Sequence, residues 1–281
     1  MERKKITIPG IQIKKEQKKK ITMLTAYDYP TALLIDRAGI DMILVGDSVG
    51  MVVLGYDSTV PVTMDEMMHH AKAVRRAVNY ALVVGDMPFM SYHVSKEEAI
   101  ANAGRFMKEA GCDAVKLEWV NNVAEITKAI VDSGIPVMGH IGLTPQTASQ
   151  LGGFKVQGKD ATAAKKLLNA AEALEKAGCF SIVLECIPEQ ISDIITDALK
   201  IPTIGIGAGA GCDGQVLVTY DMLGLFERFT PKFVKQYANL SPGIYKAVVA
   251  YKEEVEALQF PSKEHTFFIK DEELKKLKKK A

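Results

Sequence analysis

Short apolar runs recur along this chain, and most of them end in a charged or titratable residue. The clearest run, Met42 to Val45, is followed after one glycine by Asp47 and Ser48. Runs this short are typical of strands that are buried on both faces. The same pattern returns at positions 82–86, 114–118, 137–140 and 182–185, which end in Asp86, Glu118, His140 and Glu185.

Helical segments separate these runs. Capping boxes, in which a Ser or Thr stands three positions before a Glu, begin helices at Thr63 and Ser95. The pattern predicts strands near 20–27, 42–45, 82–86, 114–118, 136–140, 182–185, 202–207 and 215–220. It predicts helices near 30–38, 63–79, 95–110, 121–133, 160–177, 188–199 and 231–257, the last one broken at Ser241–Pro242. Positions 49–61 and 142–158 are predicted to be long connections.

Eight strands that alternate with helices predict a parallel sheet, and eight such units predict closure into a (β/α)8 TIM barrel. The 281 residues suit one barrel domain, with a polar lead at 1–20 and a Lys/Glu-rich tail at 260–281. In this fold the active residues come from the C-terminal ends of the strands. The acids of this sequence stand at those positions.

Composition narrows the classes of function. A net charge of +1 gives no general attraction to nucleic acid or to an anionic membrane, so neither is expected as a partner. The four cysteines have no C-x-x-C spacing, which argues against a zinc site or a disulfide framework. Residues 1–20 hold no apolar segment of a signal peptide, and no apolar stretch reaches about 18 residues. We therefore expect a soluble cytoplasmic protein.

Lysines are concentrated near both ends of the chain. Basic runs without interleaved aromatic residues are usually solvated termini rather than binding tails. We interpret in this way Lys14, Lys15, Lys18, Lys19, Lys20, Lys275, Lys276, Lys278, Lys279 and Lys280.

Carboxylates outnumber cations at the predicted strand ends. Lys116 and Glu118 are two positions apart on one strand, so their side chains point the same way, which in a barrel can be inward. With Asp47 and Asp86 close by, a further cation is needed, and Mg²⁺ prefers oxygen ligands. Each acid alone is more often a turn residue or a helix cap. The set of Asp47, Asp86 and Glu118 instead favours a magnesium site.

Three further features carry alternatives. Glu185 has apolar sequence neighbours, which predict a raised pKa and a role as a base, although a structural pair with a cation is equally consistent. His140 is either a polar core residue or a hydrogen-bonding partner of a substrate. The glycines of 205–211 suit a phosphate cradle, but no basic residue lies among them, so tight turns are the preferred interpretation.

From Thr22 to about Glu256 the chain resembles the ketopantoate hydroxymethyltransferase family, also described as 3-methyl-2-oxobutanoate hydroxymethyltransferases. The resemblance rests on ordered motifs, which are more specific together than any one alone. They are Leu24-Thr-Ala-Tyr-Asp28, Val45-Gly-Asp-Ser48, Thr59-Val-Pro-Val-Thr-Met64, Gly85-Asp-Met-Pro-Phe-Met90, Val115-Lys-Leu-Glu118, Gly139-His-Ile-Gly-Leu-Thr-Pro-Gln146, Leu184-Glu-Cys-Ile-Pro188, and Ile204-Gly-Ile-Gly-Ala-Gly209 with Cys212-Asp-Gly-Gln-Val216.

The resemblance implies an activity. A hydroxymethyl group passes from 5,10-methylenetetrahydrofolate to 3-methyl-2-oxobutanoate through a magnesium-stabilised enolate, and the product, ketopantoate, enters pantothenate and coenzyme A biosynthesis. It also implies a homo-oligomer, commonly a decamer of two pentameric rings built as a pentamer of dimers.

The resemblance implies site residues as well. Asp47 and Asp86 are matched to direct magnesium ligands, and Glu118 to a ligand that acts through water. The residues matched to ketoacid contacts are Asp47, Ser48, Asp86 and Lys116, with His140 matched to an active-site histidine and Glu185 to the base. Trp119 and Val120 depart from the glycines that usually follow the metal-site Glu.

Two other functions share part of this pattern. A magnesium-dependent carbon–carbon lyase or mutase of the phosphoenolpyruvate mutase and isocitrate lyase type would have the same type of barrel and the same acids. Such enzymes usually carry a Lys-Lys-Cys-Gly-His-type motif, which this sequence lacks. A non-catalytic binding or assembly barrel would be supported by loss of the strand-end acids, all of which are present.

Overall fold

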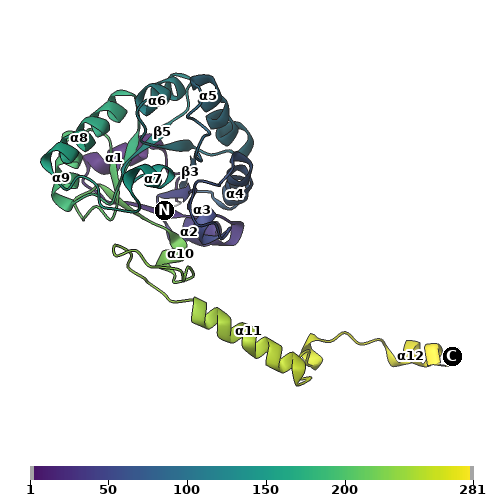
Figure 1. Cartoon of the computed structure of the whole chain (residues 1–281). Coiled ribbons are helices and arrows are strands. Elements are labelled where there is room, and N and C mark those ends of the chain that lie inside the picture. Colours follow the sequence, from purple (N-terminus) through teal and green to yellow (C-terminus); the bar gives the residue numbers. More distant parts are fainter. Residues whose placement is uncertain (1–2, 279–281) are drawn as a thin grey trace.

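A closed barrel of parallel strands forms the centre of the protein in a computed structural model that describes residues 3–278 (Figure 1). Each strand pairs with its neighbour in sequence, and β1 pairs with β8 to close the ring. The strands are β1 (Ile21–Thr25), β2 (Met42–Val45), β3 (Leu82–Asp86), β4 (Ala114–Glu118), β5 (Val137–Gly142), β6 (Ser181–Glu185), β7 (Thr203–Ile206) and β8 (Gly214–Leu217). The predicted (β/α)8 fold is confirmed.

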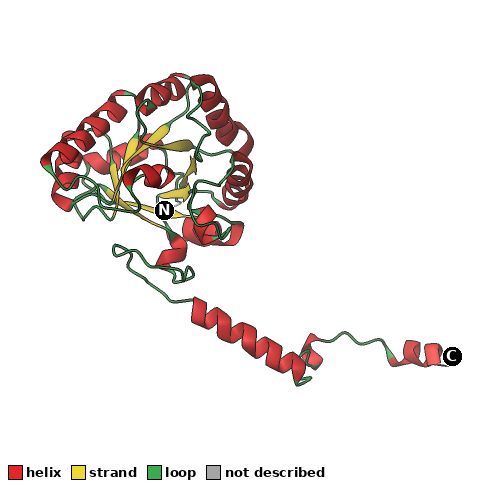
Figure 2. Ribbon diagram, in the orientation of Figure 1, coloured by secondary structure: helices red, strands yellow, loops and turns green. Residues whose placement is uncertain are grey.

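Helices surround the strands, as the red and yellow ribbons of Figure 2 show. The α-helices are α1 (Ile8–Glu16), α2 (Tyr29–Ala38), α3 (Val49–Val52), α4 (Met64–Ala77), α5 (Lys96–Arg105), α6 (Val123–Asp132), α7 (Ala148–Leu151), α8 (Ala161–Lys176), α9 (Glu189–Ala198), α10 (Thr219–Met222), α11 (Ser241–Glu256) and α12 (Asp271–Lys278). Three other helical turns are η1 (Phe106–Ala110), η2 (Pro145–Thr147) and η3 (Lys263–His265). No helix in residues 3–278 is long and apolar enough to cross a membrane.

Alternating side chains give the barrel an inner and an outer core. Met42 and Leu44 of β2 belong to one buried cluster, whereas Ile43 and Val45 belong to the cluster that includes the surrounding helices. This is the period of two that a pleated strand imposes. On β4, Ala114 lies in the inner cluster, so positions 116 and 118 face the same interior nearer the C-terminal end. The alternation places the polar residues in the uppermost interior layer.

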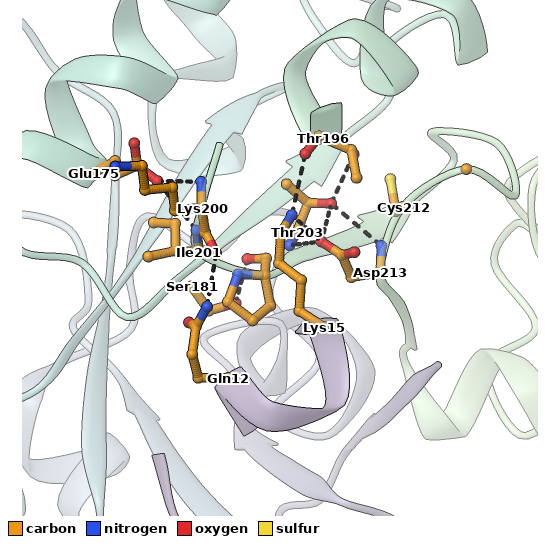
Figure 3. Close-up of polar contacts among 12 residues, drawn as sticks. Gln12, Lys15, Glu175, Ser181, Thr196, Lys200, Ile201, Thr203, Cys212 and Asp213 are labelled. Carbon is orange, nitrogen blue, oxygen red and sulfur yellow. Dashed lines mark hydrogen bonds and ion pairs between the residues drawn. The ribbon is translucent and has the colours of Figure 1, made fainter. Parts of the chain in front are cut away.

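The lower end of the barrel is covered by α1, so the interpretation of the lead as a solvated terminus was wrong for several lysines. Ile11 of α1 is fully buried in the inner cluster. Lys14 lies 2.6 Å from a carboxylate oxygen of Asp41, and Lys15 lies 2.8 Å from one of Asp213, as Figure 3 shows for Lys15. Lys20 donates to the carbonyl oxygen of Cys212. Lys14 and Lys15 therefore tie α1 to the N-terminal ends of β2 and β8, whereas Lys18 and Lys19 are exposed, as predicted.

The bounds of the eighth strand and of the last long helix differ from those predicted from the sequence. The eighth strand stops at Leu217, because Thr219 hydrogen-bonds through its backbone N–H and its hydroxyl to Thr25 and starts α10. The predicted break at Ser241–Pro242 is the beginning of α11, since proline is tolerated in the first turn of a helix. Residues 231–240 form no helix.

The last helices leave the barrel. Figure 1 shows α11 and α12 extending away from it, and neither helix has a buried residue. The lysines of α12 are exposed, as predicted, whereas Lys279 and Lys280 lie outside the described residues. Because α11 has no buried residue, its exposed side chains are available for a contact between subunits.

We predict that the plug formed by α1 contributes measurably to stability. Replacing buried Ile11 with Ala should lower the free energy of unfolding by about 2–5 kcal/mol, because a cavity forms in the inner core. Ile13→Ala is the matched control, since the Ile13 side chain is 47% exposed on the same helix and its loss should cost less than about 0.5 kcal/mol. Urea unfolding of both variants measures the difference, and equal losses would contradict the plug.

Candidate active site

A cavity of about 420 Å³ lies at the C-terminal ends of the strands. The structure brings together in its lining every site residue that the sequence predicted, namely Asp47, Ser48, Asp86, Lys116, Glu118, His140 and Glu185. They come from the ends of β2, β3, β4, β5 and β6, which are consecutive in the barrel. Strand pairing sets the level of these residues along the barrel axis: Asp86 is level with Lys116, and Glu118 is level with His140.

Lys116 lies at the centre of the charged groups. Its ammonium nitrogen is 2.8 Å from Oδ1 of Asp86, 3.9 Å from Oε1 of Glu118 and 3.4 Å from Nδ1 of His140. Burial alone would lower the pKa of Lys116, but the carboxylates of Asp86 and Glu118 outweigh burial and raise it. Lys116 is therefore a buried, permanently charged ammonium group.

Asp47 and Asp86 form a pair of buried carboxyl groups. The backbone N–H of Asp47 donates to Oδ2 of Asp86 at 3.2 Å, so the two groups are held side by side. Burial raises the pKa of Asp47 well above its usual range, and the charges of Asp86 and Glu118 raise it further. Burial also raises the pKa of Asp86, although Lys116 opposes the shift. Burial is thus the main cause of both raised pKa values, and neighbouring carboxylates add to it.

Glu118 and His140 form a second pair. Burial would raise the pKa of Glu118, but its contact with His140 and the charge of Lys116 together bring that pKa below the ordinary value. The His140 ring has the opposite balance: burial and Lys116 lower its pKa, but the carboxylates of Glu118 and Glu185 raise it to about 9. His140 is therefore an imidazolium at neutral pH, lying between two carboxylates.

Glu185 does not have the apolar surroundings that its sequence neighbours suggested. Its Oε2 lies 3.2 Å from Nε2 of His140, and its side chain is 15% exposed toward the cavity. Val183 and Glu185 face the barrel interior, whereas Ile182 and Leu184 pack against the outer helices, so neighbours in sequence are not neighbours in space. This contact agrees with the alternative interpretation, in which Glu185 is paired with a cationic side chain. The partial exposure of Glu185 leaves its carboxylate accessible to a substrate.

Gln146 and Tyr92 connect the carboxylates, and sequence reasoning gave neither of them a role. The Gln146 side chain donates to Oδ2 of Asp47 at 2.8 Å, and its backbone N–H donates to Oε2 of Glu118 at 3.0 Å. The hydroxyl of Tyr92 donates to Oε1 of Gln146 at 2.8 Å. Pro145 begins the short turn that carries Gln146 into the site. In the sequence, Gln146 is visible only as a polar residue directly after Thr-Pro, within the long connection predicted at 142–158.

Ser48 lies at the edge of the charged groups. Its hydroxyl is 2.8 Å from the hydroxyl of Tyr27, a fully buried residue just beyond β1. Ser48 also precedes α3, a short helix inside the connection predicted at 49–61. The contact with Tyr27 fixes where the Ser48 hydroxyl is presented.

The glycine-rich segment after β7 is not built as a phosphate cradle. Glu189 accepts a hydrogen bond from the backbone N–H of Ala210 and packs where a side chain on Gly209 would lie. Asp193 occupies the corresponding space beside Gly211. Carboxylates at these positions would repel phosphate, so the preferred interpretation as tight turns agrees with the structure.

The rest of the cavity is mainly apolar. It is lined from β7, β8 and the segments after them by Ile206, Val216, Val218, Asp221, Phe226, Phe229, Pro231, Lys232 and Phe233, and from the segment before α8 by Phe154, Lys155 and Val156. Asp221 is a carboxylate on this side, and it was missed because the predicted strand ended at Tyr220, one residue before it.

Donor chemistry decides whether these residues suit a metal ion. Asp47, Asp86, Glu118 and Glu185 offer carboxylates around two cationic groups, Lys116 and His140, so a divalent cation would balance the charge. Within residues 3–278, no three His, Cys, Asp or Glu side chains are arranged as a complete metal site. Mg²⁺ commonly binds one or two carboxylates and completes its shell with water and substrate oxygens. The buried pair of Asp47 and Asp86 meets that requirement.

Comparison with known proteins gives a consistent result. A sequence model of the family described as "Ketopantoate hydroxymethyltransferase" matches residues 5–263. A 3-methyl-2-oxobutanoate hydroxymethyltransferase of Syntrophomonas wolfei is 60% identical over 273 residues, covering 97% of this chain and 99% of that protein. One from Moorella thermoacetica is 60% identical over 266 residues, covering 95% and 99%.

Solved structures share the fold at low identity. 2,3-dimethylmalate lyase, a member of the PEP mutase/isocitrate lyase superfamily, has a TM-score of 0.56 and 15% identity, covering 92% of this chain and 91% of its own. Phosphonopyruvate hydrolase, solved with oxalate and Mg²⁺, has a TM-score of 0.56 and 12% identity, covering 92% and 93%. These likenesses confirm the predicted type of barrel.

We predict that Lys116 holds the buried carboxylates in place. Replacing it with Met should lower the free energy of unfolding by about 3–5 kcal/mol, because Asp86 loses its partner inside the protein. Lys128→Met on the surface of α6 is the control and should cost less than about 0.5 kcal/mol.

The loss should depend on pH in one direction. Folding already raises the pKa values of Asp47 and Asp86, and removing Lys116 raises them further. A carboxyl group whose pKa is raised by folding favours the folded state when protonated, and this contribution is lost as the pH rises. Urea unfolding without metal should show a smaller deficit at about pH 5 than at about pH 8. A deficit that does not change with pH would contradict this electrostatic account.

Proposed function

This chain belongs to the ketopantoate hydroxymethyltransferase family, and we propose how its cavity carries out the family's reaction. The chain forms ketopantoate from 3-methyl-2-oxobutanoate in pantothenate biosynthesis, and that reaction uses 5,10-methylenetetrahydrofolate as cosubstrate. The observation that carries the proposal is the convergence of Asp47, Asp86, Lys116, His140 and Glu185 on one cavity.

Asp47 and Asp86 are the proposed magnesium ligands, with Glu118 holding the ion through water. Three observations support this assignment: the two carboxyl groups are adjacent, their pKa values are raised, and the site is short of positive charge. Phosphonopyruvate hydrolase, which shares the fold, has been solved with oxalate and Mg²⁺. Bound magnesium would supply positive charge that polarises the ketone of the substrate and acidifies its C3 proton.

Lys116 and Ser48 are proposed to bind the ketoacid with Asp47 and Asp86. Lys116 offers a permanent positive charge on the cavity floor, where the substrate's oxygens need it. As C3 loses its proton, negative charge grows on the keto oxygen, and a preorganised ammonium group stabilises that charge better than water does. Ser48, fixed by Tyr27, provides a hydroxyl group for a further hydrogen bond.

Glu185 is the proposed base. It reaches the cavity from the end of β6, and its carboxylate can accept the C3 proton of a ketoacid held near Lys116. His140 is proposed to act as a positioning residue, because its imidazolium lies between Glu118 and Glu185 and orients both.

The one-carbon transfer balances as follows. The C3–H bond breaks, a C3–CH₂ bond forms, and both C–N bonds of the folate methylene group break. Water supplies the hydroxyl oxygen of the product. The C3 proton and the two hydrogens of water end on the product hydroxyl and on the two folate nitrogens, which gives ketopantoate and tetrahydrofolate.

A homo-oligomer is proposed, with α11 in the contact between subunits. The helix carries apolar residues along one face, and they are exposed, with Tyr245 71% and Val248 61% accessible. An apolar helix face without any buried residue marks an association site, and a second copy of the chain is the partner that the family resemblance implies. The decamer of two pentameric rings remains part of this proposal.

We predict that Glu185→Gln separates binding from chemistry. The amide cannot accept the C3 proton, so kcat should fall by about 10²–10⁴-fold. Calorimetric binding of 3-methyl-2-oxobutanoate with magnesium should stay within about threefold of the wild type, because Lys116 and the acids are unchanged. Glu172→Gln on the exposed face of α8 is the control and should keep full turnover. A Glu185→Gln variant with near-normal kcat would exclude Glu185 as the base.

We predict that charge on the apolar face of α11 breaks the assembly. The double variant Ile244→Asp with Val248→Asp should elute with a smaller mass in size-exclusion chromatography with light scattering, because carboxylates would have to be buried. Lys246→Asp lies on the opposite face of the helix and should leave the mass unchanged. An unchanged mass in the double variant would remove α11 from the subunit contact.

A further inference from the structure

Barrel closure divides the cavity into two sectors. The charged sector comes from β2 to β6 and holds the groups described above. The other sector comes from β7, β8 and β1, which are adjacent because β1 pairs with β8. The first sector suits a small ketoacid, whereas nothing assigned so far occupies the second.

Asp221 is the polar group of the second sector that lacks a protein partner. It lies on α10, lines the cavity and is 8% exposed. Within residues 3–278 no group donates a hydrogen bond to its carboxylate, and burial raises its pKa to about 6. A carboxylate that is largely removed from water, faces the cavity and has no protein donor is an acceptor for a ligand that carries N–H groups. A ketoacid is not that donor, since its own carboxylate would be repelled.

Aromatic side chains stand beside Asp221. Phe226 is buried and makes an edge-to-face contact with Phe229 at 5.3 Å between ring centroids. The Phe229 ring is 49% exposed, so one of its faces is free to cover a planar ligand. Phe233 packs so closely against Gly207 that a Cβ atom at this position would lie 2.7 Å from the ring. This sector therefore offers flat apolar walls around a single buried acceptor.

Two lysines lie toward the outside of the same cavity. Lys155 and Lys232 line it and are exposed, and neither makes an ion pair within the part of the chain that the structure describes. Gln157, two residues after Lys155, donates its backbone N–H to the carbonyl oxygen of Cys186, which ties this segment to the end of β6 beside Glu185. Positive charge is thus available for the outer end of a long anionic ligand.

We propose that this sector is the folate subsite, with Asp221 accepting hydrogen bonds from the N3–H and 2-amino groups of the pterin ring. The inference rests on the proposed function, which requires a folate but assigns no residue to it. Phe229 then covers the planar part of the cosubstrate, and Lys155 and Lys232 meet the carboxylates of its glutamate tail. This orientation directs the one-carbon unit toward Glu185 and C3 of the ketoacid.

Tetrahydrofolate binding to the Asp221→Asn variant tests the subsite. Loss of a charged acceptor should weaken the Kd for tetrahydrofolate, measured by calorimetry, by about 10–100-fold. Asp65→Asn, on the exposed side of α4, is the control and should bind as the wild type does. Binding of 3-methyl-2-oxobutanoate and deuterium exchange at its C3 should be unchanged in both variants, because they depend on the charged sector.

A ligand analogue identifies the atoms involved. The wild type should bind 2-desamino-2-methyl-tetrahydrofolate about 10–100-fold more weakly than tetrahydrofolate, whereas Asp221→Asn should bind the two equally. If the analogue bound more weakly than tetrahydrofolate by the same factor in both proteins, Asp221 would not contact the 2-amino group. An unchanged Kd for tetrahydrofolate in Asp221→Asn would overturn the subsite.

A second variant covers the case in which Asp221→Asn does not fold. Phe229→Ala removes a half-exposed ring and should weaken tetrahydrofolate binding by about 5–30-fold, whereas Leu34→Ala on the surface of α2 should have no effect. A normal Kd for Phe229→Ala would contradict the aromatic wall. Absence of C3 exchange in the wild type would instead overturn the proposed reaction, while the folate Kd values would still decide the subsite.

Discussion

The ion pair between Lys116 and Asp86 is the interaction on which the rest of the site depends. Carboxyl groups that are taken out of water prefer to be neutral, and only a buried cation keeps them ionised at the bottom of a protein cavity. Lys116 is 2.8 Å from Asp86, its charge helps to lower the pKa of Glu118, and it opposes the rise in the pKa of Asp47 that burial causes. Lys116 and His140 face four carboxyl groups in the cavity, so a divalent metal would supply positive charge that the protein does not.

The barrel provides this arrangement through two simple geometric rules. Alternation along each strand sends every second side chain inward, so the last inward position of each strand reaches the cavity. Closure then places β2 to β6 on one side and β7, β8 and β1 on the other. Reactive charges and apolar walls are consequently separated within one cavity, as a reaction between a small acid and a large flat cosubstrate requires.

Much of this was predictable from local sequence. Asp86 and Glu118 end apolar runs, and a period of two is enough to put Lys116 and Glu118 on one face. The contact between Glu185 and His140 was not predictable. The two residues lie on neighbouring strands, and neither segment alone determines which residues pair between the strands. The same applies to Gln146, which hydrogen-bonds to Glu118 from a short turn, and to Asp221, which lines the cavity from α10, because both depend on contacts with residues distant in sequence. α1 was missed because its lysines looked solvated, although their partners are acids at the N-terminal ends of distant strands.

In the proposed mechanism the charged sector removes the C3 proton of 3-methyl-2-oxobutanoate without any help from folate. Proton NMR in heavy water, with the wild-type protein and the ketoacid alone, measures that step directly by the loss of the C3 signal. We expect exchange that requires magnesium and stops when the metal is chelated. No exchange either with or without magnesium would contradict it, because the base, the metal site or the substrate would then be wrongly assigned.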